Sequence, residues 1–127
     1  MSGTDQVTKA LMIKALDAAT LRHQAIATNI ANANSVGYQP LRVNFEEQLG
    51  FARAALAGGN SVLTPGDIAG VRAVLEQEPA PAAGNAAVMI DMEMVKLSQN
   101  TIQYQALLKG LAGRGSIISF AVNEGKR

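Results

Sequence analysis

The chain has no cysteine and no tryptophan, and aromatic residues make up only 4% of its 127 residues. Without cysteine it forms no disulfide bond and offers no thiolate as a nucleophile or zinc ligand. It has one histidine, so no second imidazole is present to share a metal ion with the first. These absences exclude thiolate chemistry and the metal sites that are built from cysteines or from several histidines.

Charge of one sign is also missing. The 11 lysines and arginines nearly balance the 10 aspartates and glutamates, for a net charge of +1. This balance does not favour nucleic acid or an anionic membrane as the main partner. No uninterrupted run of about 18 apolar residues occurs, so we expect no transmembrane helix. The N-terminus has no basic region followed by an apolar run, so we expect no cleaved signal peptide.

The hydrophobic fraction is 48%, but alanine supplies much of it. Alanine buries little area, and apolar burial stabilises a fold by roughly 25 cal/mol per Å². A chain of this length forms one domain with a modest core. We therefore expect a marginally stable monomer that gains stability from partners.

The N-terminal segment predicts a long helix from about residue 5 to residue 33. Its apolar residues follow two adjacent rows at helical spacing. The first row repeats every seven residues, as in a coiled-coil seam, and comprises Met12, Leu16, Ala19, His23, Ile26, Ile30 and Ala33. The second row comprises Val7, Leu11, Ala18, Leu21 and Ala25. Two rows predict several packing neighbours, although periodicity alone is equally compatible with an ordinary amphipathic helix of a small bundle. Within the first row, we expect His23 to be a packed side chain.

An asparagine-rich turn ends this helix. Asn29, Asn32, Asn34 and Gly37 precede Tyr38, and asparagine and glycine tolerate the left-handed backbone that closes a helix. A simple C-cap explains the stop, but it does not explain three asparagines within six residues.

The middle of the chain predicts short elements. Residues 38–45 alternate apolar and polar side chains after Pro40, which predicts an extended segment. A short helix is predicted from Phe45 to Leu56, a turn over residues 64–67, and a strand within residues 71–78. Residues 58–61 break the helix, and residues 79–85 read as a linker.

The C-terminal segment repeats the seven-residue rhythm. Its main row comprises Ile90, Met94, Leu97, Thr101, Tyr104, Leu108 and Leu111, and a flanking row comprises Val95, Ile102 and Ala106. Lys96, Gln99, Asn100 and Gln103 are expected on other faces. Gly110, Gly113 and Gly115 weaken a helix by up to ~1 kcal/mol each relative to alanine.

The sequence therefore predicts a mainly α fold. The long N- and C-terminal helices pair as an antiparallel coiled coil around a small irregular, β-containing middle segment. Residues 1–37 and 88–127 form one discontinuous assembly domain, and residues 38–87 form the middle segment. Apolar faces left unburied by this pairing would mark interaction surfaces.

Carboxylates occur in pairs, at residues 46 and 47, 76 and 78, and 91 and 93. Paired carboxylates can perform acid–base catalysis. None has a histidine or cysteine nearby in the sequence, so we expect them on solvated faces. Gly66 and Gly70 lack the lysine and hydroxyl residue of a phosphate loop. We expect no enzyme, no cofactor, no bound metal and no small-molecule substrate.

Two motifs resemble a known family. The run Asn29-Ile30-Ala31-Asn32-Ala33-Asn34, followed by Gly37-Tyr38-Gln39, resembles the N-terminal signature of the bacterial flagellar rod and hook proteins. The runs Asp91-Met92-Glu93-Met94 and Gln99-Asn100-Thr101-Ile102-Gln103-Tyr104-Gln105-Ala106-Leu107 are similar to the proximal-rod members of this family. The likeness covers the two terminal thirds. The chain departs from the family at Val36, where a proline is usual, and at Arg42 and Asn44, near which an acidic residue is common.

The resemblance implies a structural subunit of the flagellar basal-body rod. Such subunits are exported through the flagellar type III apparatus without a cleaved signal and assemble in the periplasm. Their partners are other copies, other rod subunits, the export gate and membrane-ring adaptor proteins, and their terminal segments are typically unfolded until they assemble. By analogy, residues 5–33 and 88–122 carry the subunit contacts. The candidate interface residues are Leu11, Met12, Leu16, Ile26, Ile30, Met94, Leu97, Tyr104, Leu108 and Leu111.

Two other interpretations remain open. The chain could be another rod or junction component of the same apparatus. It could also be a stand-alone helical binding module or chaperone with a preformed groove, which would protect its terminal amides from exchange in the isolated monomer.

Overall fold

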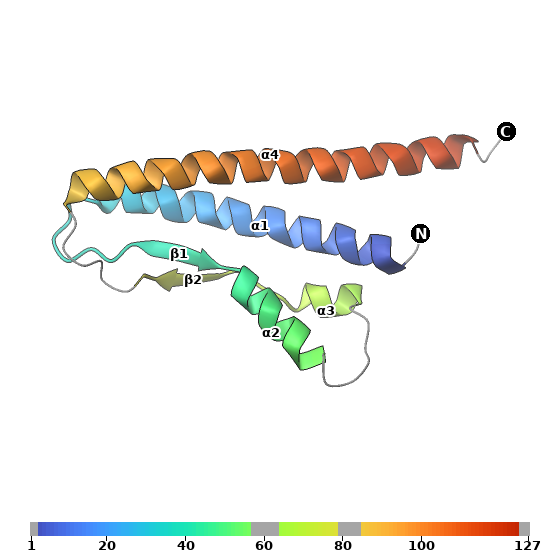
Figure 1. Cartoon of the computed structure of the whole chain (residues 1–127), viewed down its shortest axis with the longest axis horizontal. Helices are drawn as coiled ribbons and strands as arrows, with labels where there is room; N and C mark the ends of the chain where they lie inside the picture. Colours follow the sequence, from blue (N-terminus) through green and yellow to red (C-terminus); the bar gives the residue numbers. More distant parts are fainter. Residues whose placement is uncertain (1–2, 57–63, 79–84, 125–127) are drawn as a thin grey trace.

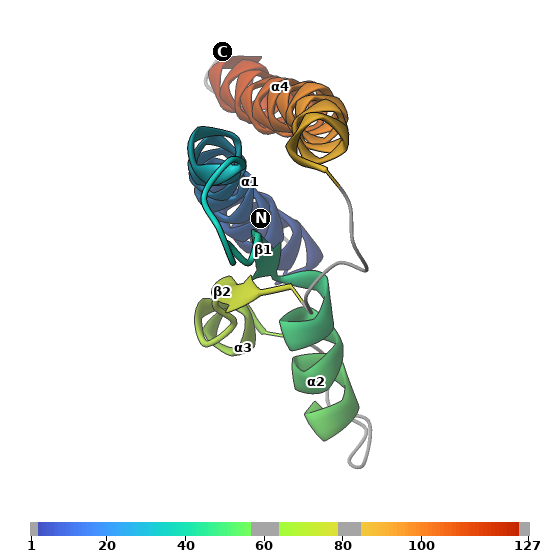
Figure 2. The ribbon, with the colours of Figure 1, turned by 90° about the vertical axis from the view of Figure 1, so that its left-hand side faces the viewer.

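The computed structural model describes residues 3–56, 64–78 and 85–124. Two long helices, α1 (Gly3–Asn32) and α4 (Ala86–Glu124), run antiparallel along the molecule (Figure 1). Between them in sequence come β1 (Leu41–Asn44), α2 (Glu46–Leu56), α3 (Pro65–Ala69) and β2 (Val74–Gln77). Figure 2 shows α1 between α4 on one side and the small middle elements on the other. The mainly helical fold, with paired terminal helices and a β-containing middle, is as predicted.

The two apolar rows of α1 face two different neighbours. The second row packs on the middle segment, where Ala18, Leu21 and Ala25 meet Val43 and Phe45. The first row faces α4, where the backbone carbonyl of its member Ala19 accepts a hydrogen bond from an α4 side chain. The prediction that α1 packs on several neighbours is confirmed, since it contacts α4, β1 and α3.

The hydrophobic core lies between α1 and the middle segment. Its buried cluster comprises Ala18, Ala25, Val43, Phe45 and Val71. Alanines on α1 let β1 approach the helix closely, and the larger side chains of the cluster come from the middle segment. Among the side chains that the structure describes, none of the buried apolar ones belongs to α4.

The middle elements follow the sequence with small differences. β1 and β2 pair antiparallel, with Leu41 opposite Gln77 and Asn44 opposite Val74. They fall inside the predicted extended segments, and α2 begins one residue after the predicted start. The predicted break at residues 58–61 and most of the linker at residues 79–85 lie outside the described residues.

Residues 64–67 do more than form a turn, because they begin the helix α3. Thr64 is its N-cap, and its hydroxyl accepts from the Asp67 backbone N–H at 3.2 Å. The Asp67 carboxylate accepts in return from the Thr64 backbone N–H at 2.9 Å, which completes a capping box with Pro65 in the first turn. These hydrogen bonds, the backbone one foremost, lower the pKa of Asp67 below its usual value.

Helix α4 begins earlier than predicted and passes its glycines without a break. Asn85 caps it, since its side-chain oxygen accepts from the Val88 N–H at 2.8 Å. As residue numbers rise along α4 they fall along α1: Glu93 lies beside Asn29 and Asn100 beside Ala19. At Gly110, a Cβ would lie 2.9 Å from the terminal methyl group of Met12, so glycine permits the close approach there. In the described part of the chain, no helix has the length and apolarity to span a membrane.

The absence of cysteine makes this antiparallel register testable by an engineered disulfide. Met12 and Gly110 oppose one another, so a chain carrying Met12→Cys and Gly110→Cys should form an intramolecular disulfide readily under mild oxidation. The measurement is the gel shift of the oxidised chain. Met12→Cys with Gly113→Cys is the matched control, because Gly113 has no neighbouring atom within 4 Å. Equal disulfide yields in the two chains would contradict the register.

Candidate assembly site

The side chain of Asn29, near the end of α1, joins the asparagine-rich turn to β1 and to α4. It is 0% exposed. Its Nδ2 donates to the Leu41 carbonyl at 2.8 Å and to the Glu93 carboxylate at 3.1 Å. Its Oδ1 accepts from the Leu41 N–H at 2.8 Å and from the Tyr38 hydroxyl at 2.7 Å. The amide therefore pairs with Leu41 as a neighbouring strand would, and all four of its hydrogen-bonding positions are filled.

The remaining motif residues have smaller roles. Asn32 donates to the Thr28 carbonyl within its own helix at 2.8 Å, and Asn34 is exposed. Gly37 has φ +73°, the left-handed conformation that glycine adopts without strain. The turn thus brings the Tyr38 hydroxyl back to Asn29. Of the three asparagines, Asn29 connects α1 to β1 and α4, a role that a C-cap does not require.

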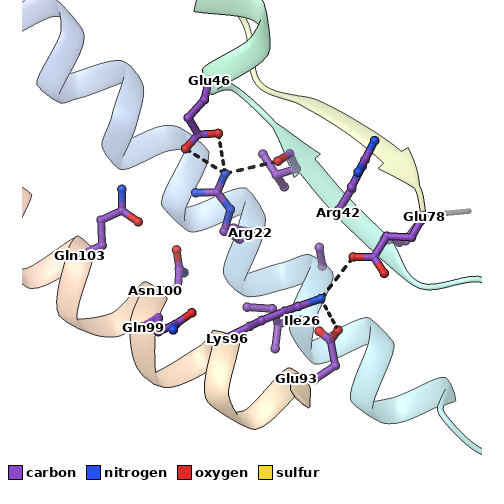
Figure 3. Close-up of a pocket in the computed structure, with 13 residues that line it drawn as sticks. Arg22, Ile26, Arg42, Glu46, Glu78, Glu93, Lys96, Gln99, Asn100 and Gln103 are labelled. Carbon is purple, nitrogen blue, oxygen red and sulfur yellow. Dashed lines mark hydrogen bonds and ion pairs between the residues drawn. The ribbon is translucent and has the colours of Figure 1, made fainter. Parts of the chain in front are cut away.

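A charged chain of contacts extends this connection to α4 and β2. Glu93 is only 2% exposed, and it accepts from Asn29 and from the Lys96 ammonium at 3.1 Å. Lys96 also donates to the Glu78 carboxylate at 3.2 Å (Figure 3). The Glu78 backbone N–H donates to the Pro40 carbonyl at 2.7 Å. These contacts therefore tie α4 to α1 and to the sheet. We call their five residues the buried polar network after Asn29 and Glu93, which are buried, while Tyr38, Lys96 and Glu78 are half-buried.

The buried polar network shifts two pKa values in the same direction. Burial of Lys96 by itself lowers the pKa, but hydrogen bonds to Glu93 and Glu78 and their negative charges outweigh it, so the pKa is raised. The pKa of Tyr38 is raised by burial and by the nearby negative charge of Glu93. Both groups therefore hold their protons more tightly in the folded chain.

The face of α4 that meets α1 differs from the predicted seam. Its buried side chains are Glu93 and Asn100, although Glu93 was expected on a solvated face and Asn100 on another face of the helix. Asn100 Nδ2 donates to the Ala19 carbonyl at 2.8 Å, and its buried Oδ1 has no hydrogen-bond partner. Small residues on α1 leave room for these polar side chains, so the contact forms on a polar stripe of α4 beside the apolar row.

The candidate interface residues divide between the two helices. Ile26 is buried, and Leu11, Met12, Leu16 and Ile30 are half-buried along α1. On α4, Leu97 and Leu111 are half-buried. Met94, Tyr104 and Leu108 are exposed, which leaves them open to contacts with other molecules.

His23 is exposed rather than packed, which corrects the expectation from its row. A straight helix advances by about 100° per residue, so a seven-residue row drifts, and His23 falls at the edge of the α1–α4 contact. There it lines an apolar groove of about 570 Å³ between α1 and α4, together with Ala19, Thr20, Gln24, Asn100, Thr101, Tyr104, Gln105 and Leu108.

A second groove, of about 340 Å³, lies between α1, β1 and α4 (Figure 3). It is lined by three cationic and three acidic side chains, all of which are paired. Arg22 donates to Glu46 at 3.1 Å and to the Val43 carbonyl at 3.3 Å. Lys96 is held by Glu93 and Glu78, and Arg42 lies 3.4 Å from Glu76. Within the described residues, no group of three or more potential metal ligands gathers.

A further exposed row on α4 was only partly recognised from the sequence. Val88, Met92, Val95 and Ile102 are 50%, 57%, 57% and 68% exposed, at steps of four, three and seven residues. Only Val95 and Ile102 belong to the predicted flanking row. Val88 and Met92 could have been added to that row from the sequence, because they precede Val95 by seven and three residues.

A scan of the chain against protein-family models finds no match, and a search of curated protein sequences finds no similar protein.

Substituting Asn29 tests the role of the buried polar network. Asn29→Ala leaves the Leu41 peptide groups, the Tyr38 hydroxyl and the Glu93 carboxylate without this partner, and we expect about 2–4 kcal/mol lower free energy of unfolding. Urea denaturation followed by circular dichroism measures the loss. Asn32→Ala is the control, since it removes one local helix contact and should cost within about 0.5 kcal/mol. Equal losses in both variants would show that Asn29 has no special role.

The raised pKa values predict a loss of stability in alkaline solution. Both groups have a higher pKa folded than unfolded, so their contribution is complete below their ordinary values of 10.0 for Tyr38 and 10.5 for Lys96. It is lost as the pH rises through the folded values. We expect the chain carrying Tyr38→Phe and Lys96→Met to lose less stability than wild type between about pH 9 and pH 11.5 in urea titrations. An identical alkaline decline in the two chains would contradict this assignment.

Proposed function

We propose that this chain is a structural subunit of the bacterial flagellar basal-body rod, similar to the proximal rod protein FlgB, and that it polymerises through its terminal helices. The observation that carries the proposal is the arrangement of α4. The buried side chains of this helix are Glu93 and Asn100, while seven of its described large apolar side chains remain exposed on two rows and the others are half-buried. Exposed apolar rows of this length are typical of surfaces that other molecules cover.

The role of Asn29 also supports the resemblance to the rod and hook family. Its motif residues Asn29, Gly37 and Tyr38 contribute to one connection between the first helix, the turn and β1. A signature with such a structural role is expected in a protein whose function is to present its helices in a fixed orientation. The motif residues therefore have a structural role, which suits an assembly subunit and requires no catalytic group.

The proposal specifies partners and location. The chain would contact other copies of itself, other rod subunits, the export gate and the membrane-ring adaptor proteins. It would lie in the periplasmic part of the basal body, after export by the flagellar type III apparatus without a cleaved signal peptide. The alanine-rich core suits this route, because a modest apolar burial is readily unfolded for passage through a narrow channel.

One observation favours a different class of function. The apolar groove between α1 and α4, lined by His23, Tyr104 and Leu108, is the kind of preformed site that a helical binding module or chaperone would use. Hydrogen exchange separates the two functions. A binding module keeps its terminal amides protected as a free monomer, whereas a rod subunit gains protection over residues 5–33 and 88–122 on assembly.

Deleting the gene in its host tests the proposal directly. We expect non-motile cells whose isolated basal bodies show membrane rings in electron micrographs but no rod or hook. Restoring the gene on a plasmid should restore the rod. Rings with a partial rod would favour another rod or junction component, and intact rods with normal swimming would count against a function in the rod.

A charge introduced at Leu108, in the exposed row that also contains Met94 and Tyr104, should block assembly. Leu108 is 48% exposed, so Leu108→Asp should leave the fold intact. Burying the added carboxylate in a subunit contact is strongly unfavourable, and we expect at least a hundredfold fewer complete rods in basal-body preparations. Ser98→Asp is the control, because it adds the same charge on an exposed polar position of the same helix. Normal rods in the Leu108→Asp strain would remove Leu108 from the interface.

A further inference from the structure

The two exposed apolar rows of α4 lie on different sides of the helix. At about 100° per residue, the row of Val88, Met92, Val95 and Ile102 is roughly 160° away from the row of Met94, Tyr104 and Leu108. We call the first the ridge and the second the groove row, because Tyr104 and Leu108 line the apolar groove beside α1. The exposed polar Ser98 separates the two rows on one side, and the contact with α1 separates them on the other.

The ridge is long enough to fill the groove. It runs over about 21 Å of helix from Val88 to Ile102, and α4 lines the groove over about 12 Å, from Asn100 to Leu108. The ridge lies on the convex surface of one helix. The groove is the furrow between α1 and α4, and its volume is about 570 Å³. Apolar side chains at steps of four and three residues, as from Val88 to Val95, form the kind of ridge that packs into such a furrow, and the exposed Gln99 occupies the step before Ile102.

The charges of the two surfaces also match. The residues that line the groove carry no formal charge when His23 is neutral, and the ridge side chains are apolar. The side chains of the ridge and of the groove therefore bring no charge of their own into the contact, and only Asp91, exposed beside Val88 and Val95, has to stay at its edge. The second groove, with its six charged side chains, offers no such match to an apolar ridge.

From these observations we infer that the ridge of one copy packs into the groove of the next copy, in a head-to-tail contact. The inference rests on the proposed function and specifies its subunit contact. Because the two surfaces differ and lie on opposite sides of α4, a pair of copies keeps one unused ridge on one copy and one unused groove on the other. A contact of this kind extends into a chain or ring, whereas a contact of a surface with itself stops at a dimer.

A mixing experiment tests the inference on the purified full-length chain. Ile102→Asp blocks the ridge and Leu108→Asp blocks the groove, at positions 68% and 48% exposed in the monomer. Each variant alone lacks one half of every contact and should stay monomeric. Mixed together, they should form a one-to-one dimer and nothing larger, because one intact ridge meets one intact groove. Analytical ultracentrifugation measures the masses, with wild type and Ser98→Asp expected to form larger species under the same conditions.

The alternatives give different masses. If the ridge pairs with a second ridge, Leu108→Asp alone forms dimers and Ile102→Asp does not. If the groove pairs with a second groove, the reverse holds. If wild type stays monomeric at every concentration up to about 1 mM, or if the mixture stays monomeric, the inference is overturned. Circular dichroism of each variant confirms that the helices are intact.

Disulfide trapping gives a second readout that does not depend on the aspartate variants. Copies carrying Val95→Cys, mixed with copies carrying Leu108→Cys, should crosslink at least tenfold more than copies carrying Ser98→Cys mixed with the same partner. The outcome is separable from that of the gene deletion. If the mixed variants form dimers but the deletion strain keeps its rods, the contact is retained and the function in the rod is rejected. If the deletion strain loses its rods but the mixed variants form no dimers, the function is retained and the contact is rejected.

Discussion

The orientation of α1, β1 and α4 depends on one buried amide. Asn29 satisfies both peptide groups of Leu41, accepts from Tyr38 and donates to Glu93, so a single side chain fixes the strand on one face of α1 and α4 on the next. A buried amide with all its positions filled tolerates few rearrangements, since each displaced partner would lose a hydrogen bond without water to replace it. Through Glu93 and Lys96 the same constraint reaches β2.

The consequence for α4 is an unusual division of its surface. Among its described side chains, the buried ones are polar, and the large apolar ones at residues 88, 92, 94, 95, 102, 104 and 108 are exposed. Polar contacts give α4 a defined position, but they add little hydrophobic stability to the monomer. The exposed apolar area of α4 therefore remains for association, which is the physical basis for the proposal that the chain is an assembly subunit.

Much of this fold could be predicted from periodicity, and the exceptions have specific reasons. The two rows of α1 predicted that it packs on α4 and on the middle segment, because apolar rows on adjacent faces of one helix need separate partners. The inward direction of Glu93 and Asn100 could not be predicted, since a hydrophobic pattern assigns polar residues to solvent. The role of Asn29 was also hidden, because Glu93 is 64 residues away in the sequence. The Thr64–Asp67 capping box was visible in the sequence, but it was read only as a turn.

The central claim is that other copies of the chain cover the exposed apolar rows of α4. The most direct measurement is the rate at which a maleimide labels a single thiol, introduced as Ile102→Cys into a chain that has no other cysteine. We predict labelling at least tenfold slower in isolated basal bodies than in the free chain, and no such difference for Ser98→Cys. Equally fast labelling of Ile102→Cys in the two states would contradict the claim.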